Sequence, residues 1–229
     1  MAFISYIDAV TMAIKEEMEK DERVFVLGED VGRKGGVFKA TQGLYEQFGE
    51  NRVIDTPLAE SAIAGVGIGA AMYGLRPIAE MQFADFIMPA VNQIISEAAR
   101  IRYRSNNDWN CPIVIRAPYG GGVHGALYHS QSVESIFANQ PGLKIVMPST
   151  PYDVKGLLKA AIRDPDPILF FEHKRAYRLI KGEVPEDDYV IPIGKADVKR
   201  EGEDLTVITY GLCVHLALQA AEKLASENI

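Results

Sequence analysis

The residues best suited to chemistry lie in a glycine-rich segment, 120–132, which reads Gly-Gly-Gly-Val-His-Gly-Ala-Leu-Tyr-His-Ser-Gln-Ser. It follows a predicted strand, and loops at strand ends often carry function. His124 and His129 are five residues apart without a third ligand nearby, which argues against zinc. A histidine here could act as a general acid or base, or only bond to the backbone. Ser130 and Ser132 lie in no Gly-x-Ser-x-Gly elbow, so serine hydrolysis is a poor interpretation.

A second candidate is Glu60, in the first turn of a predicted helix that follows a strand through a Pro-containing turn. Open α/β sheets commonly place ligand-contacting groups at this position, although a Glu there could only complement the helix dipole. In an apolar setting the carboxylate would lose water, and it could then share or donate a proton near neutral pH. The apolar residues nearby in the sequence are Ile54, Leu58, Ala59, Ala62 and Ile63.

Three further patterns admit both a functional and a structural interpretation. The glycines of 65–70 match Gly-x-Gly-x-x-Ala, but they lie inside a predicted helix and not directly after a strand, so we expect close packing there and no dinucleotide turn. Phe83 and Phe86 could present a ring to a planar ligand, or belong to the core. Asp164 and Asp166 could help to hold a hard cation together with carbonyl oxygens, or form a solvated turn.

The elements that must position these residues alternate between strands and helices. Strands are predicted at 24–28, 52–55, 77–83, 112–117, 144–147 and 167–171. Helices are predicted from a Ser5/Asp8 cap to about residue 20 and at 60–73, 85–104, 133–139 and 152–163. This alternation predicts an α/β fold with a mostly parallel sheet and helices on both faces.

The alternation stops near residue 177, and this predicts a domain boundary. Residues 1–176 are expected to form one α/β domain, and 177–204, with two prolines and an acidic run, a linker. Residues 205–229 hold one predicted strand, 205–211, and one predicted helix, 215–226. Such a pair cannot bury enough apolar surface alone, so it is expected to be the incomplete start of a second α/β domain.

Composition excludes several classes of protein. Of the 229 residues, 31 are acidic and 24 basic, and a net charge of −7 argues against binding to nucleic acid. No stretch of roughly 18 apolar residues could span a membrane. The two cysteines, Cys111 and Cys213, form no metal or disulfide pattern. With no targeting segment in view, a cytoplasmic bacterial protein is expected.

Four segments together resemble the β subunits of thiamine-diphosphate-dependent 2-oxo acid dehydrogenases. They are Asp-Thr-Pro-Leu-Ala-Glu-Ser at 55–61, Glu-Met-Gln-Phe-Ala-Asp-Phe at 80–86, His-Gly-Ala-Leu-Tyr-His-Ser-Gln-Ser at 124–132 and Pro-Gly-Leu-Lys-Ile-Val-Met-Pro at 141–148. The resemblance covers essentially the whole chain, and the third segment is closer to the branched-chain than to the pyruvate enzymes. It implies a thiamine-diphosphate-binding fold of the pyrimidine type.

The resemblance also implies roles for single residues. Glu60 would hydrogen-bond the aminopyrimidine nitrogen of the cofactor and help to activate it, with Leu58, Gln82 and Phe86 around the ring; Phe86 stands where related subunits carry Tyr. His129 would assist decarboxylation or acyl transfer to lipoyl-lysine by proton transfer or charge stabilisation. A potassium site built mostly from carbonyls would involve Ile113, Ala161, Ile162, Asp164 and Asp166, the last in place of an Asn.

Partners follow from the same resemblance. An E1 α subunit would supply Mg²⁺ and the diphosphate half of the site in an α2β2 heterotetramer, since the sequence lacks the Gly-Asp-Gly magnesium motif. The implied reaction is oxidative decarboxylation of a branched-chain 2-oxo acid, followed by reductive acylation of the lipoyl domain of the E2 acyltransferase. A pyruvate or acetoin dehydrogenase β subunit, or a non-catalytic fragment that pairs with a partner, are the alternatives. Family β subunits continue into a full second domain, so a C-terminally truncated chain is expected.

Overall fold

Six parallel strands form the central sheet of the computed structural model, which describes residues 1–227 of the chain. Their order in the sheet is β3-β2-β4-β5-β7-β6, and every neighbouring pair is parallel. The predicted α/β class is therefore confirmed. The strands are β2 (Val24–Gly28), β3 (Val53–Asp55), β4 (Arg76–Glu80), β5 (Val114–Tyr119), β6 (Lys144–Val146) and β7 (Ile168–His173).

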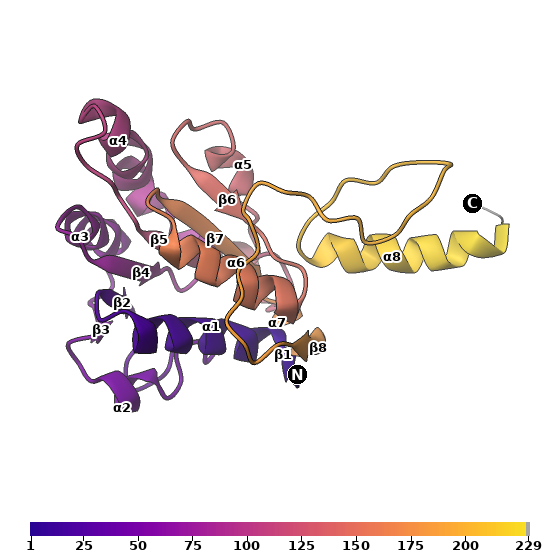
Figure 1. Ribbon diagram of the computed structural model, residues 1–229, viewed down its shortest axis with the longest axis horizontal. Coiled ribbons are helices and arrows are strands. Elements are labelled where there is room, and N and C mark those ends of the chain that lie inside the picture. Colours follow the sequence, from indigo (N-terminus) through magenta and orange to yellow (C-terminus); the bar gives the residue numbers. More distant parts are fainter. Residues whose placement is uncertain (228–229) are drawn as a thin grey trace.

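Helices cover both faces of this sheet (Figure 1). One core lies under α1 (Tyr6–Lys20) and α6 (Pro151–Arg163), and the other under α3 (Glu60–Met72) and the helical segment 84–104. Successive strand side chains alternate between the two cores, and both faces are buried, which explains why the strands are apolar throughout. The shorter helices are α2 (Leu44–Phe48), α4 (Ile101–Arg104), α5 (Glu134–Phe137) and α7 (Ala176–Leu179).

The start of α1 follows the sequence prediction in detail. The Ser5 hydroxyl accepts the N–H of Asp8, and the Asp8 carboxylate accepts the N–H of Ser5. This reciprocal capping box satisfies two backbone donors that an α-helix leaves unpaired at its first turn. Thr150 and Asp153 repeat the same arrangement at the start of α6.

A second, two-stranded sheet lies near the N-terminus, and no pattern in the sequence predicts it. Strand β1 (Ala2–Ser5) pairs antiparallel with β8 (Lys181–Val184), with Ala2 opposite Val184. Strand β8 lies inside 177–204, the segment that we expect to be a linker. The pairing joins segments from the two ends of the large domain, and no local periodicity can reveal such a contact.

The helix predicted at 85–104 is broken into short helical turns of different pitch. Two 3₁₀ turns, at 84–86 and 88–90, precede a π-helical turn at 93–97, a third 3₁₀ turn at 98–100 and finally α4. Pro89 has no backbone N–H and so interrupts a regular helical ladder. The segment nevertheless buries the side chains of Ile87, Ile94 and Ile101 in the core under α3.

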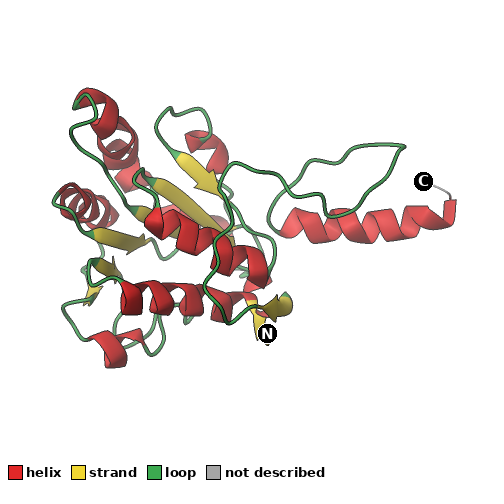
Figure 2. Cartoon of the chain, viewed as in Figure 1, coloured by secondary structure: helices red, strands yellow, loops and turns green. Residues whose placement is uncertain are grey.

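The strand predicted at 205–211 does not form. Residues 201–209 belong to the long loop that leads from β8 to α8 (Leu212–Leu224) (Figure 2). The side chains of Leu205, Val207 and Ile208 are exposed. Among the described residues no strand lies beside this segment, and a lone strand leaves its backbone groups unpaired. The helix predicted at 215–226 is present as α8, which extends away from the sheet (Figure 1).

Candidate active site

Buried polar atoms that lack a hydrogen-bond partner gather where the strands end. Glu29 follows β2, Thr56 follows β3, Asp85 comes shortly after β4, and Lys174 follows β7; each has such an atom. Buried polar groups are nearly always paired, so unpaired ones call for an explanation such as a ligand. Open α/β sheets bind their ligands outside the carboxyl ends of the strands. This edge of the sheet is therefore the candidate site.

Glu60 lies at this edge, in the first turn of α3, and its side chain is buried, with the residue 8% exposed. Glu29 is buried beside it, and Glu29 Oε1 has no hydrogen-bond partner. Burial raises the pKa of Glu29, and the negative charge of Glu60 raises it further. Glu29 therefore keeps its proton more readily than an exposed glutamate does.

The apolar setting expected for Glu60 is only partly present. Ile63 is buried, but Ile54 is 36% exposed and Leu58 is 80% exposed. The neighbours of Glu60 in the sequence therefore do not explain its burial. Glu29, which comes from a different strand, is the residue that sequence reasoning missed. An acidic residue directly after a buried apolar strand is the signal that could have indicated it.

His129 lies against two phenylalanine rings. The ring centroid of Phe83 is 4.6 Å from that of His129, and the Phe86 centroid is 5.5 Å away, both edge to face. His129 Nδ1 is 2.7 Å from the carbonyl oxygen of Gly125. A carbonyl can only accept, so Nδ1 carries the hydrogen of this bond, and in the neutral ring Nε2 is the proton acceptor.

The loop that carries His129 has a strained backbone. His124 and Ala126 have φ values of 56° and 58°, in the left-handed region that disfavours side chains with a Cβ. A Cβ added at Gly125 would lie 2.5 Å from the His129 ring. The glycine is thus required for the close approach of the backbone to this ring, and other contacts must hold the strained loop.

Of the three residues predicted to surround the pyrimidine ring, only Phe86 lies against His129. Phe86 joins the cluster of Phe83 and His129. The Gln82 side chain, half-buried just after β4, donates from Nε2 to Asp30 Oδ2 at 3.3 Å. Leu58 is exposed at the turn before α3. Leu58, Gln82 and Phe86 all lie on segments that follow the carboxyl ends of β3 and β4.

The residues predicted to bind potassium lie at the opposite edge, where β5 and β7 begin. The Asp164 carboxylate accepts Lys144 Nζ at 2.7 Å, and the Asp166 carboxylate accepts Arg102 Nε at 2.5 Å. Both carboxylates are therefore already neutralised by cationic side chains. Across the part of the chain that the structure describes, no group of three or more acidic, His or Cys side chains could hold a metal ion.

Carbonyl oxygens are the ligands that remain for a cation at this edge. The carbonyls of Ile113 and Ala161 accept the N–H groups of Ile168 and Asp164, and the carbonyl of Ile162 accepts Arg76 Nη1 at 2.7 Å. Each carbonyl oxygen has a second lone pair. A cation at this edge would therefore depend on carbonyl oxygens and not on the two carboxylates.

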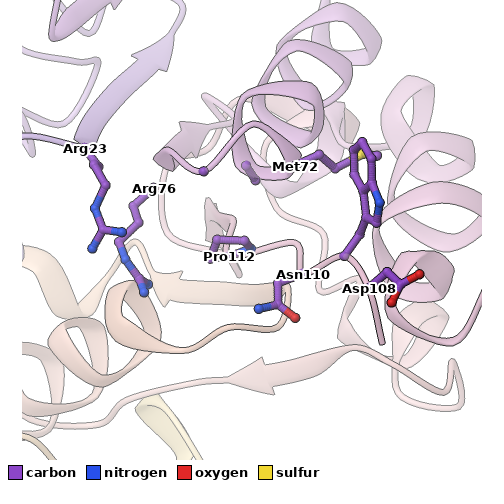
Figure 3. A pocket seen from close by; sticks show the side chains of 9 residues that line it. Arg23, Met72, Arg76, Asp108, Asn110 and Pro112 are labelled. Atoms are coloured by element: carbon purple, nitrogen blue, oxygen red, sulfur yellow. The ribbon is translucent and has the colours of Figure 1, made fainter. Parts of the chain in front are cut away.

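A cavity of about 330 Å³ also opens at the amino ends of the strands, away from the candidate site. Figure 3 shows Arg23 and Arg76 on one side of it and Asp108 and Asn110 on the other. Arg23 forms an ion pair with Asp21 at 2.7 Å, so its charge is already balanced. None of the residues singled out from the sequence lines this cavity.

Within residues 1–227, none of the helices is both long enough and apolar enough to cross a bilayer.

Comparison with known families gives two matches that together cover nearly the whole chain. Residues 3–180 match the transketolase pyrimidine-binding domain, and residues 194–229 match the transketolase C-terminal domain. The second match includes residues 228–229, which lie outside the described structure.

Individual relatives match over the full length of the chain. It is 86% identical to the 2-oxoisovalerate dehydrogenase subunit beta of Bacillus subtilis (strain 168) and 52% identical to the pyruvate dehydrogenase E1 component subunit beta of the same organism. In each case it spans 70% of the relative's length. A solved structure, described as a split gene transketolase, inactive beta4 tetramer, is similar in fold, with a TM-score of 0.78 at 23% identity; the match covers all of this chain and 69% of that one.

Proposed function

The chain belongs to the family of 2-oxo acid dehydrogenase E1 β subunits, in its branched-chain type, and we propose that it supplies the pyrimidine half of a thiamine diphosphate site. The observation that carries this proposal is the buried Glu60 carboxyl beside Glu29 at the start of α3. A carboxyl group that retains a proton can hydrogen-bond a nitrogen of an aminopyrimidine ring. The unpaired Oε1 of Glu29 supports a polar ligand at this edge.

Thiamine diphosphate, when bound, supplies the carbon nucleophile that decarboxylates a 2-oxo acid. Glu60 would hold a proton at the pyrimidine nitrogen and exchange it with the ring. Glu29 would keep a proton close to Glu60, because burial and the negative charge of Glu60 raise the pKa of Glu29.

The remaining side chains at this edge would orient the ring and exclude water. Phe86 would pack on the pyrimidine, since it stands at the rim of the cluster with Phe83 and His129. Leu58 and Gln82 would flank the ring. The large exposed fraction of Leu58 suits a residue that is covered when a cofactor or a partner binds.

His129 would act on the reacting groups through Nε2. The bond from Nδ1 to Gly125 fixes the tautomer that leaves Nε2 as acceptor. In that form the ring could take a proton during acyl transfer to the lipoyl group, and as a cation it could stabilise developing negative charge. The exposed side chains of Leu127 and Tyr128 beside it suit contact with a second protein.

Assembly and location are also part of the proposal. An E1 α subunit would supply Mg²⁺ and the diphosphate half of the site in an α2β2 heterotetramer, and the lipoyl domain of E2 would receive the acyl group. Potassium would be held by carbonyls at the 113 and 161–166 segments. Residues 1–176 would form the pyrimidine domain together with β8 and the 185–191 segment, which are held to it, so only the rest of 177–204 would be a linker. Residues 205–229 would be part of the second domain. The cytoplasmic location stays a prediction.

The decisive test of the site is Glu60→Gln, which keeps the size of the side chain and removes its exchangeable acid proton. With an α subunit, thiamine diphosphate, Mg²⁺ and 2-oxoisovalerate, we expect decarboxylation to fall by on the order of 10²-fold or more. Glu50→Gln, at an exposed glutamate, is the matched control. Wild-type activity in the Glu60 variant would refute the assignment.

Substrate preference needs a separate assay. Pyruvate is the alternative substrate, since the chain is also 52% identical to a pyruvate dehydrogenase β subunit. Comparing kcat/KM for 2-oxoisovalerate and pyruvate in one preparation separates the two. We expect the branched-chain acid to be preferred by about 10-fold or more, the scale that a few methylene groups in a pocket allow.

A further inference from the structure

Asp85 and Lys174 form a buried ion pair at the carboxyl edge that the proposed reaction does not use. The side chain of Asp85 is 0% exposed and that of Lys174 is 1% exposed. Their charged atoms, Oδ2 and Nζ, are 3.9 Å apart, and each lacks a hydrogen-bond partner. Buried charges of this kind cost free energy unless another interaction compensates.

The other oxygen of Asp85 holds the loop of His129. Oδ1 accepts the backbone N–H of Ser130 at 3.2 Å and that of Gln131 at 3.1 Å. Hydrogen bonds from backbone amides to a carboxylate are charge-assisted and stronger than neutral ones. The two residues that follow His129 are therefore fixed to the start of the segment after β4.

The same loop is closed at its base. The Gly120 N–H donates to the Gln131 carbonyl at 2.9 Å, and the Lys174 N–H donates to the Tyr119 carbonyl at 3.0 Å. Lys174 thus sits where the loop leaves β5, and Asp85 sits where the loop returns. The strained φ values of His124 and Ala126 lie between these two fixed points.

Lys174 is connected to His129 through the ring of Phe83, which contacts both side chains. Its Nζ lies 5.2 Å from the centroid of Phe83, a cation–π contact, and the Phe83 ring is in edge contact with His129 at 4.6 Å. Burial lowers the pKa of Lys174, while the charge of Asp85 raises it. The charge of Asp85 therefore offsets part of the effect of burial on Lys174, and the Phe83 ring lies between the lysine and the histidine ring.

We propose that the Asp85–Lys174 pair positions His129, with Asp85 holding the backbone of residues 130–131 and Lys174 supporting Asp85 and the Phe83 ring. The pair touches no reacting group, so both are positioning residues. The catalytic consequence rests on the proposed role of His129. The holding of the loop is a separate physical statement that can be measured without turnover.

Hydrogen exchange measures the holding directly. In the assembled complex, Asp85→Asn keeps the shape of the side chain but loses the charge that strengthens both amide bonds. We expect exchange at the Ser130 and Gln131 amides to be about 10-fold faster, on the scale of a lost charge-assisted interaction. Asp108→Asn, at an exposed aspartate, is the control and should leave these amides unchanged. Unchanged exchange in Asp85→Asn would overturn the proposal.

Kinetics in the wild-type and the His129→Ala backgrounds test whether the Asp85–Lys174 pair acts through His129. Asp85→Asn and Lys174→Met should each slow lipoyl acylation by about 10-fold, with little change in KM for the 2-oxo acid. In a His129→Ala background the same changes should cost almost nothing more, because residues that act through one group are not additive. An equal loss in both backgrounds would show general destabilisation and overturn the proposal. Lys181→Met, at an exposed lysine, is the matched control.

A double substitution keeps the test valid if the single variants fold poorly. Asp85→Asn with Lys174→Met leaves no uncompensated buried charge, so it should fold better than either single variant. It should still show fast exchange at residues 130–131. If exchange rises but His129→Ala alone keeps full activity, the proposed catalytic role of His129 fails while the holding of the loop stands.

Discussion

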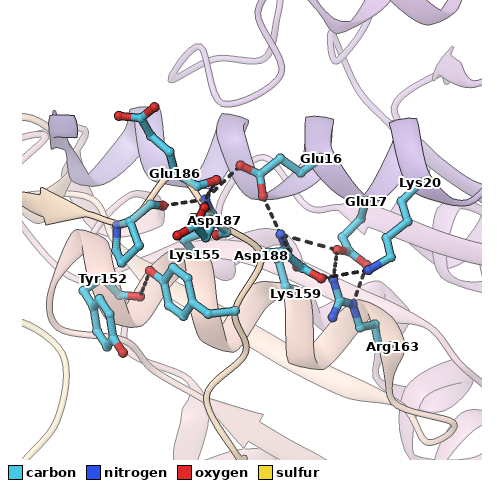
Figure 4. A network of polar contacts seen from close by, with 12 residues as sticks. Glu16, Glu17, Lys20, Tyr152, Lys155, Lys159, Arg163, Glu186, Asp187 and Asp188 are labelled. Carbon is cyan, nitrogen blue, oxygen red and sulfur yellow. Dashed lines mark hydrogen bonds and ion pairs between the residues drawn. The ribbon is translucent and has the colours of Figure 1, made fainter. Parts of the chain in front are cut away.

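Two regions of this protein bury charged side chains in opposite ways. Between α1 and α6, Lys159 is 2% exposed at its side chain and pairs with Glu16 and Asp188, while Arg163 pairs with Glu17 and Asp188 (Figure 4). Every one of these charges has an opposite partner within hydrogen-bond distance. At the carboxyl edge, by contrast, Glu29, Asp85 and Lys174 each keep a buried atom without a hydrogen-bond partner.

The difference separates structural charge from functional charge. The network between α1 and α6 fixes the 185–191 segment to the domain, because Lys155 Nζ also donates to the Pro185 carbonyl at 2.7 Å. It offers no free group to a ligand. The carboxyl edge is incompletely satisfied, and such a site gains most from a bound ligand or partner.

A third group of buried charges shows that burial alone does not distinguish structural from functional charges. Arg116 is fully buried, and donates to Glu80 at 2.6 Å and to both oxygens of Glu172, which also accepts the Tyr177 hydroxyl. This set ties β4, β5 and β7 together just below the site. Its groups are paired, so we assign it to the scaffold.

The largest expected effect on the functional side comes from His129→Ala. Loss of the general acid or base should slow acylation of the lipoyl group by on the order of 10²-fold or more. The free energy of unfolding should change little, because the ring is only half-buried. Stopped-flow acylation and chemical denaturation of one preparation check both. An unchanged acylation rate would remove His129 from the mechanism.

Lys159→Met should give the reverse pattern. The free energy of unfolding should fall by about 2 kcal/mol. The loss is smaller than for a fully enclosed pair because Glu16 keeps Lys155, Asp188 keeps Lys20 and Arg163, and both acids are partly exposed. Decarboxylation by the folded fraction should stay near that of the wild type. Lys15→Met, at an exposed surface pair, is the control. A large loss of kcat with unchanged stability would break the comparison.

The contribution of Asp188 to the free energy of unfolding should depend on pH. Hydrogen bonds from Lys159, Lys20 and Arg163 hold the pKa of Asp188 well below its ordinary 3.8. Its contribution is therefore present above pH 3.8 and is lost as pH falls further toward the folded-state pKa. Asp188→Asn should be less stable than wild type at pH 7, and the gap should close in acid. Urea denaturation over pH 2 to 7 measures it, and a gap independent of pH would contradict this assignment.

The smallest effect should come from potassium. An ion held only by carbonyls should raise the free energy of unfolding by about 1 kcal/mol at concentrations several times its dissociation constant. Denaturation in KCl and in tetramethylammonium chloride at equal ionic strength tests this. Equal stabilities in the two salts would refute the potassium proposal.

The sequence predicts elements whose signals are local. The Ser5 cap, the apolar strand at 24–28 and the place of Glu60 in the first turn of a helix all depend on residues within a few positions of one another. The structure agrees with each of these. The glycines of 65–70 also lie inside α3, where a Cβ at Gly67 would come within 2.7 Å of the Ile113 side chain.

Contacts between distant segments could not be predicted. Strands β1 and β8 pair across almost the whole large domain, Glu29 reaches Glu60 from another strand, and Lys174 reaches Asp85 across the sheet. The strand expected at 205–211 had the right composition, but a strand needs a neighbour as well as a pattern. Local periodicity does not show which distant segments meet, nor whether a predicted strand has a neighbour to pair with.

The most direct test of the comparison is Glu29→Gln, measured for stability and activity in the same preparation. Burial and Glu60 raise the pKa of Glu29 in the folded state, so its ionisation opposes folding as pH rises above its ordinary 4.5. The variant should be at least as stable as wild type at pH 7, with the difference closing as pH falls toward 4.5, while decarboxylation with the α subunit falls by about 10-fold or more. A variant that loses stability and keeps full activity would show that this carboxyl belongs to the scaffold, and would contradict the account.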